Sequence, residues 1–417
     1  MATTAPPTDR YLTLDTIRGV AVMGILLMNI VNFGLIEAAY MNPRAQGGAS
    51  GLDLGVYLVN FVLFDGKMRG LFSFLFGAST LLVIDRATAK GESPARVHYS
   101  RMFWLLVFGL AHLWLIWRGD ILAHYAMVGM VAFLFRNRPV KTLIGIGIAL
   151  LLVHCLIMAS LVAQVTMLAN GALPGQSAAE QAKALAEFQN GFGVPATAHI
   201  AEEMATYLAG YDDIVAARFA EMKWMPFFFV LVVGFETLAY MLFGMAALRS
   251  GMLTGAWERR RYVRWLAIGF GIGIPAYSAL AAWMVDQDFS IQSVVTAAMG
   301  LSTPIRPLMI LGWASLIVLL MRPGAGLTTR IAAAGRMAFT NYLVTSLICT
   351  TIFYGYGFGL YGQLHRAQLY LIVLVIWAGM LLWSKPWLTR FAYGPFEWLW
   401  RSLSRASFQP MRGGALR

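Results

Sequence analysis

Ten long apolar segments, joined by mostly short polar loops, constrain the fold of this chain more than any other feature of its sequence. As helices they are long enough to cross a hydrocarbon core about 30 Å thick. Charged residues make up only 12% of the chain, against about 25% in soluble domains. The sequence therefore predicts an all-α, polytopic transmembrane bundle, with helices at residues 14–36, 54–85, 100–118, 120–137, 140–169, 224–249, 262–285, 290–321, 332–358 and 366–389.

The charges of the loops predict the orientation of this bundle. Basic residues follow every even-numbered segment and also fill the C-terminal stretch, which is the pattern of loops on the cytoplasmic side. The net charge of +12 is spread over these loops, so it indicates contact with anionic lipid rather than with nucleic acid. We expect both termini in the cytoplasm.

The loop at residues 170–223 has the opposite charge balance, with three cations against seven carboxylates, and is expected outside. Its apolar residues recur at helical spacing, which predicts short amphipathic helices interrupted near Gly191 to Pro195. The chain thus divides into N-terminal transmembrane helices at 1–169, this extracytoplasmic loop, and a C-terminal transmembrane part at 224–417.

Ionisable side chains inside the apolar segments are the candidates for function, because each costs a few kcal/mol to insert into hydrocarbon. Asp15 and Arg18 share one face of the first helix, where Arg18 serves either as an interfacial anchor or as a donor to phosphate. The overlong second segment is interrupted by Asp65, Lys67 and Arg69. This interruption is either an element that faces a ligand or a kink held by a salt bridge.

A second group of candidates lies in the middle of the chain. His112 and Asp120 flank a tight turn that can bring them together. His112 is then a general base that Asp120 orients, or Asp120 caps the next helix while His112 has a structural role. His124 shares a helix face with Asp120. Glu236 and Arg306 lie deep in separate segments, and their pairing would offset the insertion cost of both.

The sequence gives no support to several other kinds of site. The two cysteines, Cys155 and Cys349, lie in apolar runs, which favours neither a disulfide framework nor a zinc site. No phosphate-cradling glycine loop, H-E-x-x-H metal signature or nucleophile elbow occurs in the chain. We therefore expect no bound metal and no resident cofactor.

Four stretches of the chain resemble the YeiB-like bacterial inner-membrane proteins, which carry a C-terminal domain of unknown function numbered 418. They are LDTIRGVAVMGILLMNIVNF, FDGKMRGLFSFLFG, GLAHLWLIWRGDILAHYAMVG and the C-terminal region that begins GRMAFTNYLVTSL. This resemblance spans nearly the whole chain. It implies a multi-pass protein of the bacterial inner (plasma) membrane, but it does not imply an activity.

The opening LDTIRG also resembles the first-helix signature of transmembrane acyltransferases. That resemblance implies a helical bundle in which an acyl donor arrives from the cytosol and the acceptor is modified on the far side. Those enzymes commonly place a histidine near the end of helix one or in the loop after it, whereas this chain has Met28, Asn29 and Asn32 in helix one. His112 and Asp120 would have to take the catalytic role.

The leading functional hypothesis is an acyltransferase-like enzyme. It would move an acyl group from acyl-coenzyme A, used as a co-substrate, to an envelope glycan, a lipid or a small hydroxylated acceptor. In this hypothesis Arg18, Lys67 and Arg69 hold the phosphate-rich donor or the acyl carbonyl. His112 is the general base and Asp120 orients it.

The sequence leaves two alternatives open. One is a transporter or export factor for a small molecule or lipid, whose polar pathway would be lined by Asp65, Lys67, Glu236 and Arg306. The other is a non-enzymatic membrane assembly partner that docks through the acidic loop at 170–223. The lipid bilayer is a partner in every case, and a homodimer is compatible with all three hypotheses.

Overall fold

The structure, a computed structural model, describes residues 7–412, which form helices and no strand. The helices of the first half are α1 (Pro7–Gly34), α2 (Gly51–Leu63), α3 (Lys67–Ala89), α4 (Pro94–Ala111), α5 (Leu122–Ala132), α6 (Val140–Ala169), α7 (Ala178–Phe192) and α8 (Thr197–Tyr207). The second half contains α9 (Tyr211–Met222), α10 (Met225–Arg249), α11 (Arg259–Asp286), α12 (Ile291–Val295), α13 (Arg306–Leu320), α14 (Gly326–Arg336), α15 (Ala338–Phe353), α16 (Arg366–Arg390) and α17 (Pro395–Ser404). Four shorter elements are the 3₁₀ turns η1 (Glu37–Tyr40) and η3 (Phe133–Phe135) and the π-helical turns η2 (His112–Ile116) and η4 (Thr296–Leu301).

The predicted helical membrane bundle is confirmed, although not every predicted segment is a full span. A helix pair bent by 62°, Ile291–Leu301 with Arg306–Leu320, has the composition of one broken span. Two further segments, Leu122–Phe135 and Ala338–Phe353, are apolar helices too short to span alone. The described residues contain seven full-length apolar helices, at Leu12–Gly34, Gly51–Ala89, Pro94–Ile116, Val140–Ala169, Met225–Arg249, Arg259–Asp286 and Arg366–Arg390. The chain is therefore a multi-pass membrane protein.

The predicted interruption of the second segment is present, and a second long segment is also deformed. The α2–α3 break ends at Gly66, which has a φ of 69° and lies so close to Arg306 that a Cβ would meet the guanidinium Nε at 2.5 Å. The second deformation precedes α13, whose first turn contains Pro307. Proline has no backbone N–H to donate, so it begins a helix more readily than it continues one. The two irregular stretches thus meet at Arg306.

Helices α3 and α10 pack with their backbones in close contact. A Cβ on Gly77 would collide with the Met241 carbonyl, and a Cβ on Gly244 would collide with the Phe74 carbonyl. Small residues allow membrane helices to approach in this way, because no side chain separates the two backbones. This contact fixes the register of α3 against α10 and holds the charged residues of both helices side by side.

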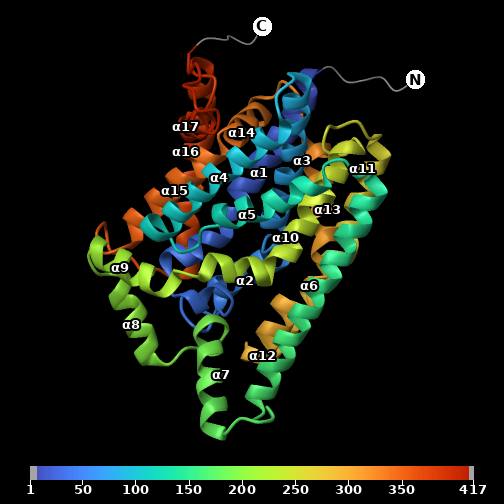
Figure 1. Cartoon of the computed structure of the whole chain (residues 1–417). Coiled ribbons are helices and arrows are strands. Elements are labelled where there is room, and N and C mark those ends of the chain that lie inside the picture. The colour runs from blue at the N-terminus through green and yellow to red at the C-terminus, as the bar shows by residue number, and fades with distance from the viewer. Residues whose placement is uncertain (1–6, 413–417) are drawn as a thin grey trace.

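The two ends of the bundle differ in character. Helix α17 and the start of α1 lie at one end, and the loop helices α7, α8 and α9 lie at the other (Figure 1). We call the first the basic end, because arginines such as Arg86, Arg249 and Arg336 occupy the helix termini there, and the second the outer end. The amphipathic helices predicted in the loop are confirmed, with a break between Phe192 and Thr197.

Glu203 of α8 ties the outer helices to the rest of the bundle. Its carboxylate accepts hydrogen bonds from the Glu37 backbone N–H at 2.9 Å and from the Tyr361 hydroxyl at 2.8 Å. Arg118 pairs with the same carboxylate at 2.8 Å and with Glu37 at 3.2 Å, and its guanidinium lies over the Tyr207 ring. The outer helices are therefore docked on the bundle, at a junction that collects residues from distant parts of the chain.

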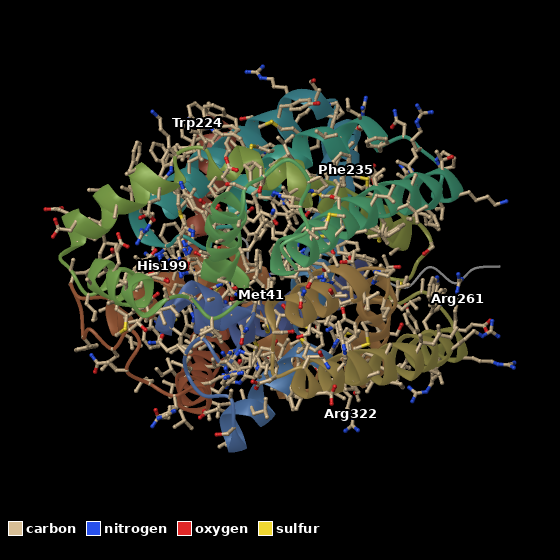
Figure 2. The ribbon with its side chains drawn as sticks, turned by 90° about the horizontal axis from the view of Figure 1, so that it is seen from below. Met41, His199, Trp224, Phe235, Arg261 and Arg322 are labelled. Carbon is tan, nitrogen blue, oxygen red and sulfur yellow. The ribbon has the colours of Figure 1, made fainter. Side chains whose placement is uncertain are left out.

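Apolar side chains on the outside of the bundle have the exposure expected of a surface covered by lipid. On α10, Phe228 is 62% exposed and Leu231 is 68% exposed, and Trp224 at the start of this helix is 69% exposed. Seen from the outer end, Trp224 lies at the edge of the molecule (Figure 2). An exposed apolar face of this size is a liability in water, but it is the normal surface of a helix in hydrocarbon.

Helix α17 is held against the bundle by Glu397, which caps the start of α15. The Glu397 carboxylate accepts hydrogen bonds from the backbone N–H groups of Phe339 at 2.8 Å and Thr340 at 3.0 Å, and from the Thr340 hydroxyl. Burial raises the pKa of this carboxyl, and the hydrogen bonds oppose that rise. The cap supplies acceptors to N–H groups that have no partner within α15.

Replacing Glu397 by alanine is expected to destabilise the protein by about 1 kcal/mol, because it removes a helix cap. The change would be measured as a lower midpoint of thermal unfolding in detergent. Glu258→Ala is the matched control, since Glu258 precedes α11 but makes no capping hydrogen bond. Equal midpoints for the two variants would contradict the capping role.

Candidate functional site

A cavity of about 390 Å³ lies in the basic end of the bundle, between α1, α3, α4, α5, α14, α15 and α17. Most of its wall is apolar, and the apolar side chains come from several helices, among them Val22, Ile25, Phe72, Leu75 and Leu105. The described residues around it come from both halves of the chain. Such a cavity can enclose an apolar chain of a ligand, while the polar groups at its rim fix the rest.

Five arginines line the cavity, and they come from five different segments. They are Arg18, Arg86, Arg101, Arg336 and Arg401. Arg18 pairs with Asp15 at 2.7 Å and donates to the Ser79 hydroxyl at 3.1 Å, and the Arg101 guanidinium lies 4.1 Å from the Trp400 ring centre. Guanidinium groups match phosphate oxygens in geometry and charge, so this rim is suited to a ligand that carries several phosphates.

A smaller pocket, of about 10 Å³, adjoins the cavity along α1. It shares Val22, Ile25 and Tyr342 with the larger cavity and adds Asn29 and Ser346. The Asn29 side chain is half-buried, and the described residues form no side-chain hydrogen bond with it. Asn29 can therefore donate to a ligand that occupies this pocket.

His112 and Asp120 form a buried pair next to this pocket. The His112 Nδ1 lies 2.9 Å from the Asp120 Oδ1, and both side chains are only 1% exposed. The Asp120 Oδ2 accepts a hydrogen bond from the Ala123 N–H at 2.8 Å, so this carboxylate both orients His112 and caps α5. The His112 Nε2 has no hydrogen-bond partner in the described part of the chain. The centre of its ring lies 5.2 Å from that of Tyr342, which lines both the cavity and the pocket.

Three candidate residues from separate helices form a second charged site. Arg69 of α3 and Arg306 of α13 both donate to the Glu236 carboxylate of α10, Arg69 at 2.6 Å. The Tyr240 hydroxyl also donates to Glu236, at 2.9 Å. Glu236 and Arg306 were expected to pair, but the sequence did not indicate that Arg69 joins them. None of these three lines the cavity described above.

The remaining candidates lie outside the cavity. Lys67 donates to the Phe61 carbonyl at 2.5 Å and lies 3.2 Å from the Tyr277 ring centre. Asp65 accepts a hydrogen bond from the Tyr40 hydroxyl. His124 makes a 2.8 Å hydrogen bond with the Thr237 hydroxyl.

Of the three residues assigned to hold the donor, only Arg18 therefore lines the cavity, and Lys67 and Arg69 are separate from it. Sequence reasoning also missed four of the cavity arginines, Arg86, Arg101, Arg336 and Arg401, by treating them as ordinary loop charges. Within the described residues, no group of three or more histidine, cysteine or acidic side chains is placed to hold a metal ion.

Comparison with known proteins places the chain in a family. Residues 247–407 match the family model described as a protein of unknown function, DUF418. YeiB of Escherichia coli (strain K12), described as uncharacterized, is 33% identical over 413 residues, which are 96% of this chain and 98% of YeiB. The chain belongs to the YeiB-like family. YxaH of Bacillus subtilis (strain 168), also described as uncharacterized, is 31% identical over 421 residues, which are 97% of this chain and 96% of YxaH. No solved structure gives a significant match.

In this YeiB-like chain, the region matched by the family model supplies only part of the cavity. The matched region contains Arg336, Tyr342 and Arg401. Arg18 comes from the N-terminal half, and so does His112, which packs against Tyr342. The similarity to YeiB and YxaH covers both halves. The site is thus built from the whole length that the YeiB-like proteins share.

Proposed function

We propose that this protein is an acyltransferase-like enzyme of the bacterial inner membrane that uses acyl-coenzyme A as its donor. One observation carries the proposal: a mostly apolar cavity lined by five arginines adjoins a small pocket, and both are lined by Tyr342, which packs against His112 of the buried His112 and Asp120 pair. The arginines would bind the donor phosphates, and the apolar walls would enclose the arm that carries the acyl group.

The spacing of two residues along α1 supports this donor. Arg18 and Asn29 are eleven residues apart on α1, so they are separated by about 16 Å along the helix axis. Coenzyme A carries its phosphates at one end and its thioester at the other, joined by the extended pantetheine arm. A donor bound with its phosphates at Arg18 would bring the acyl carbonyl to the level of Asn29.

The chemical step assigned to this site is transfer of the acyl group to a hydroxyl. The His112 Nε2, which has no partner in the structure, would accept the proton of the acceptor hydroxyl as its oxygen attacks the acyl carbon. Asp120 would keep the Nδ1 proton in place and favour the charged ring. Asn29 would donate to the carbonyl oxygen as the bond between the acyl carbon and sulfur breaks. The protonated His112 would pass its Nε2 proton to the departing sulfur, so that coenzyme A leaves as the thiol. The acceptor would be an envelope glycan, a lipid or a small hydroxylated molecule.

Binding of labelled acetyl-coenzyme A to the purified protein tests the donor assignment. Arg18→Gln is expected to weaken binding about tenfold, because one charge-assisted hydrogen bond to phosphate is lost. Arg260→Gln is the control, since Arg260 lies in the same basic end but does not line the cavity. Failure of the unmodified protein to bind acetyl-coenzyme A, or equal binding by both variants, would contradict the proposal.

A further inference from the structure

The cluster of Arg69, Glu236 and Arg306 has more positive than negative charge. Each oxygen of the Glu236 carboxylate is already used: Oε2 accepts from Arg69 at 2.6 Å, and Oε1 accepts from Arg306 and from the Tyr240 hydroxyl. Two guanidinium groups therefore share one carboxylate. A charge without a partner is expensive inside a membrane protein, so the excess requires an explanation.

The charged residues nearest in sequence do not correct this imbalance. The Lys67 side chain donates to the Phe61 carbonyl rather than to an acid. Asp65 is a carboxylate, but the hydrogen bond it accepts comes from the Tyr40 hydroxyl and not from either guanidinium. Among the described residues, Glu236 is thus the one acid that bonds to both Arg69 and Arg306.

Arg69 is the member of the cluster that a ligand can reach. Its side chain is 28% exposed, whereas those of Arg306 and Glu236 are 8% and 0% exposed. The Arg69 Nη1 is buried and has no hydrogen-bond partner among the described residues, and the same holds for the His124 Nδ1. His124 lies near the cluster, because its Nε2 bonds to the hydroxyl of Thr237, the residue that follows Glu236. Two buried nitrogen atoms among the described residues, one of them in the Arg69 guanidinium itself, thus remain without a hydrogen-bond partner.

This cluster is separate from the arginine-lined cavity. Tyr125 lines that cavity, and its hydroxyl bonds to the Arg69 carbonyl at 3.1 Å and to Ser73 at 3.0 Å, so it stands between the two sites. Along α3, Arg69 lies seventeen residues from Arg86 at the basic end, which is about 26 Å. The cluster therefore lies toward the outer half of the bundle.

We propose that Arg69 is the contact residue of a binding site for an oxyanion, a carboxylate or phosphate group of a ligand that enters from the outer half of the bundle. The anion would accept from the Arg69 Nη1 and neutralise the excess charge, while Glu236 keeps Arg306 paired. This site goes beyond the proposed acyl transfer, because it uses none of the residues that line the donor cavity.

Thermal unfolding of the purified protein in detergent tests the site, with inorganic phosphate as a soluble probe and phosphatidylglycerol as a lipid probe. At tenfold excess over its dissociation constant, a bound anion is expected to raise the unfolding midpoint by about 2 °C, relative to chloride at equal ionic strength. Arg69→Gln should abolish the rise, since it removes the accessible guanidinium but leaves Glu236 paired with Arg306.

Arg44→Gln is the control, because Arg44 is an exposed outer arginine that already pairs with Asp288. It should respond to the anions as the unmodified protein does. A response to phosphate supports a soluble ligand, and a response to the lipid alone supports a headgroup. A response that Arg69→Gln retains, or no response of the unmodified protein to either anion, overturns the proposal. Binding of acetyl-coenzyme A should be unaffected by Arg69→Gln, which keeps this test distinct from that of the donor cavity.

Discussion

Glu236→Gln is expected to destabilise the protein by about 3 to 5 kcal/mol, the largest loss that we predict for any single substitution. The reason is that it leaves the buried Arg306 and the partly exposed Arg69 without their shared counter-ion. The Arg69 and Arg306 guanidinium groups would then repel each other in the membrane interior. The loss would appear as a lower yield of monodisperse protein and a lower midpoint of thermal unfolding. Glu202→Gln, in the exposed part of α8, should leave both quantities unchanged.

A double variant separates charge from packing as the cause of that loss. Adding Arg306→Met to Glu236→Gln removes the more buried of the two cations, and the remaining Arg69 is 28% exposed and can be hydrated. Stability should therefore recover in part. If the double variant is less stable than Glu236→Gln alone, the cluster is held together by packing rather than by charge.

His112→Gln is expected to lower the rate of acyl transfer by about 10² to 10⁴, the contribution typical of a general base. Binding of acetyl-coenzyme A should be unchanged, because His112 does not line the donor cavity. The measurement is a single-turnover transfer assay with labelled donor. His199→Gln, in the outer helix α8 (Figure 2), should retain the full rate.

Asp120→Asn distinguishes orientation of the histidine from capping of the helix. Asparagine also caps helices, so α5 should stay intact and the unfolding midpoint should change little. The rate should still fall, since the neutral amide no longer stabilises a charged His112 ring. Full transfer activity in either His112→Gln or Asp120→Asn would remove this pair from the mechanism.

The fold could be predicted from the sequence wherever the deciding pattern was local. Apolar runs of spanning length predicted the bundle, and the composition of residues 170–223 predicted the outer helices. The interruption at Asp65 to Gly70 was also visible, and the break ends at Gly66. Local patterns did not predict where each individual helix begins and ends. Residues 332–358 read as one segment, but Met337 separates α14 from α15.

The candidate site depends on contacts between segments that are distant in the chain, and such contacts cannot be recognised in a single sequence. Arg86, Arg101 and Arg336 lie in three different helices, and each looks like an ordinary cytoplasmic charge until the helices are packed together. The Arg69 to Glu236 pair spans 167 residues. His112 and Asp120, only eight residues apart, could be paired from the sequence because one tight turn connects them.

The junction around Glu203 has a consequence for the order in which the protein assembles. Glu37, Arg118 and Tyr361 all bind this one carboxylate, and they are spread over most of the chain. During synthesis from the N-terminus, the first two partners are available long before the third. The outer helices cannot reach their final position until residue 361 has emerged and the helices around it have inserted. Closing the outer end is thus a late step of biogenesis, and a chain arrested before that point would expose the unfinished junction to proteases outside the membrane.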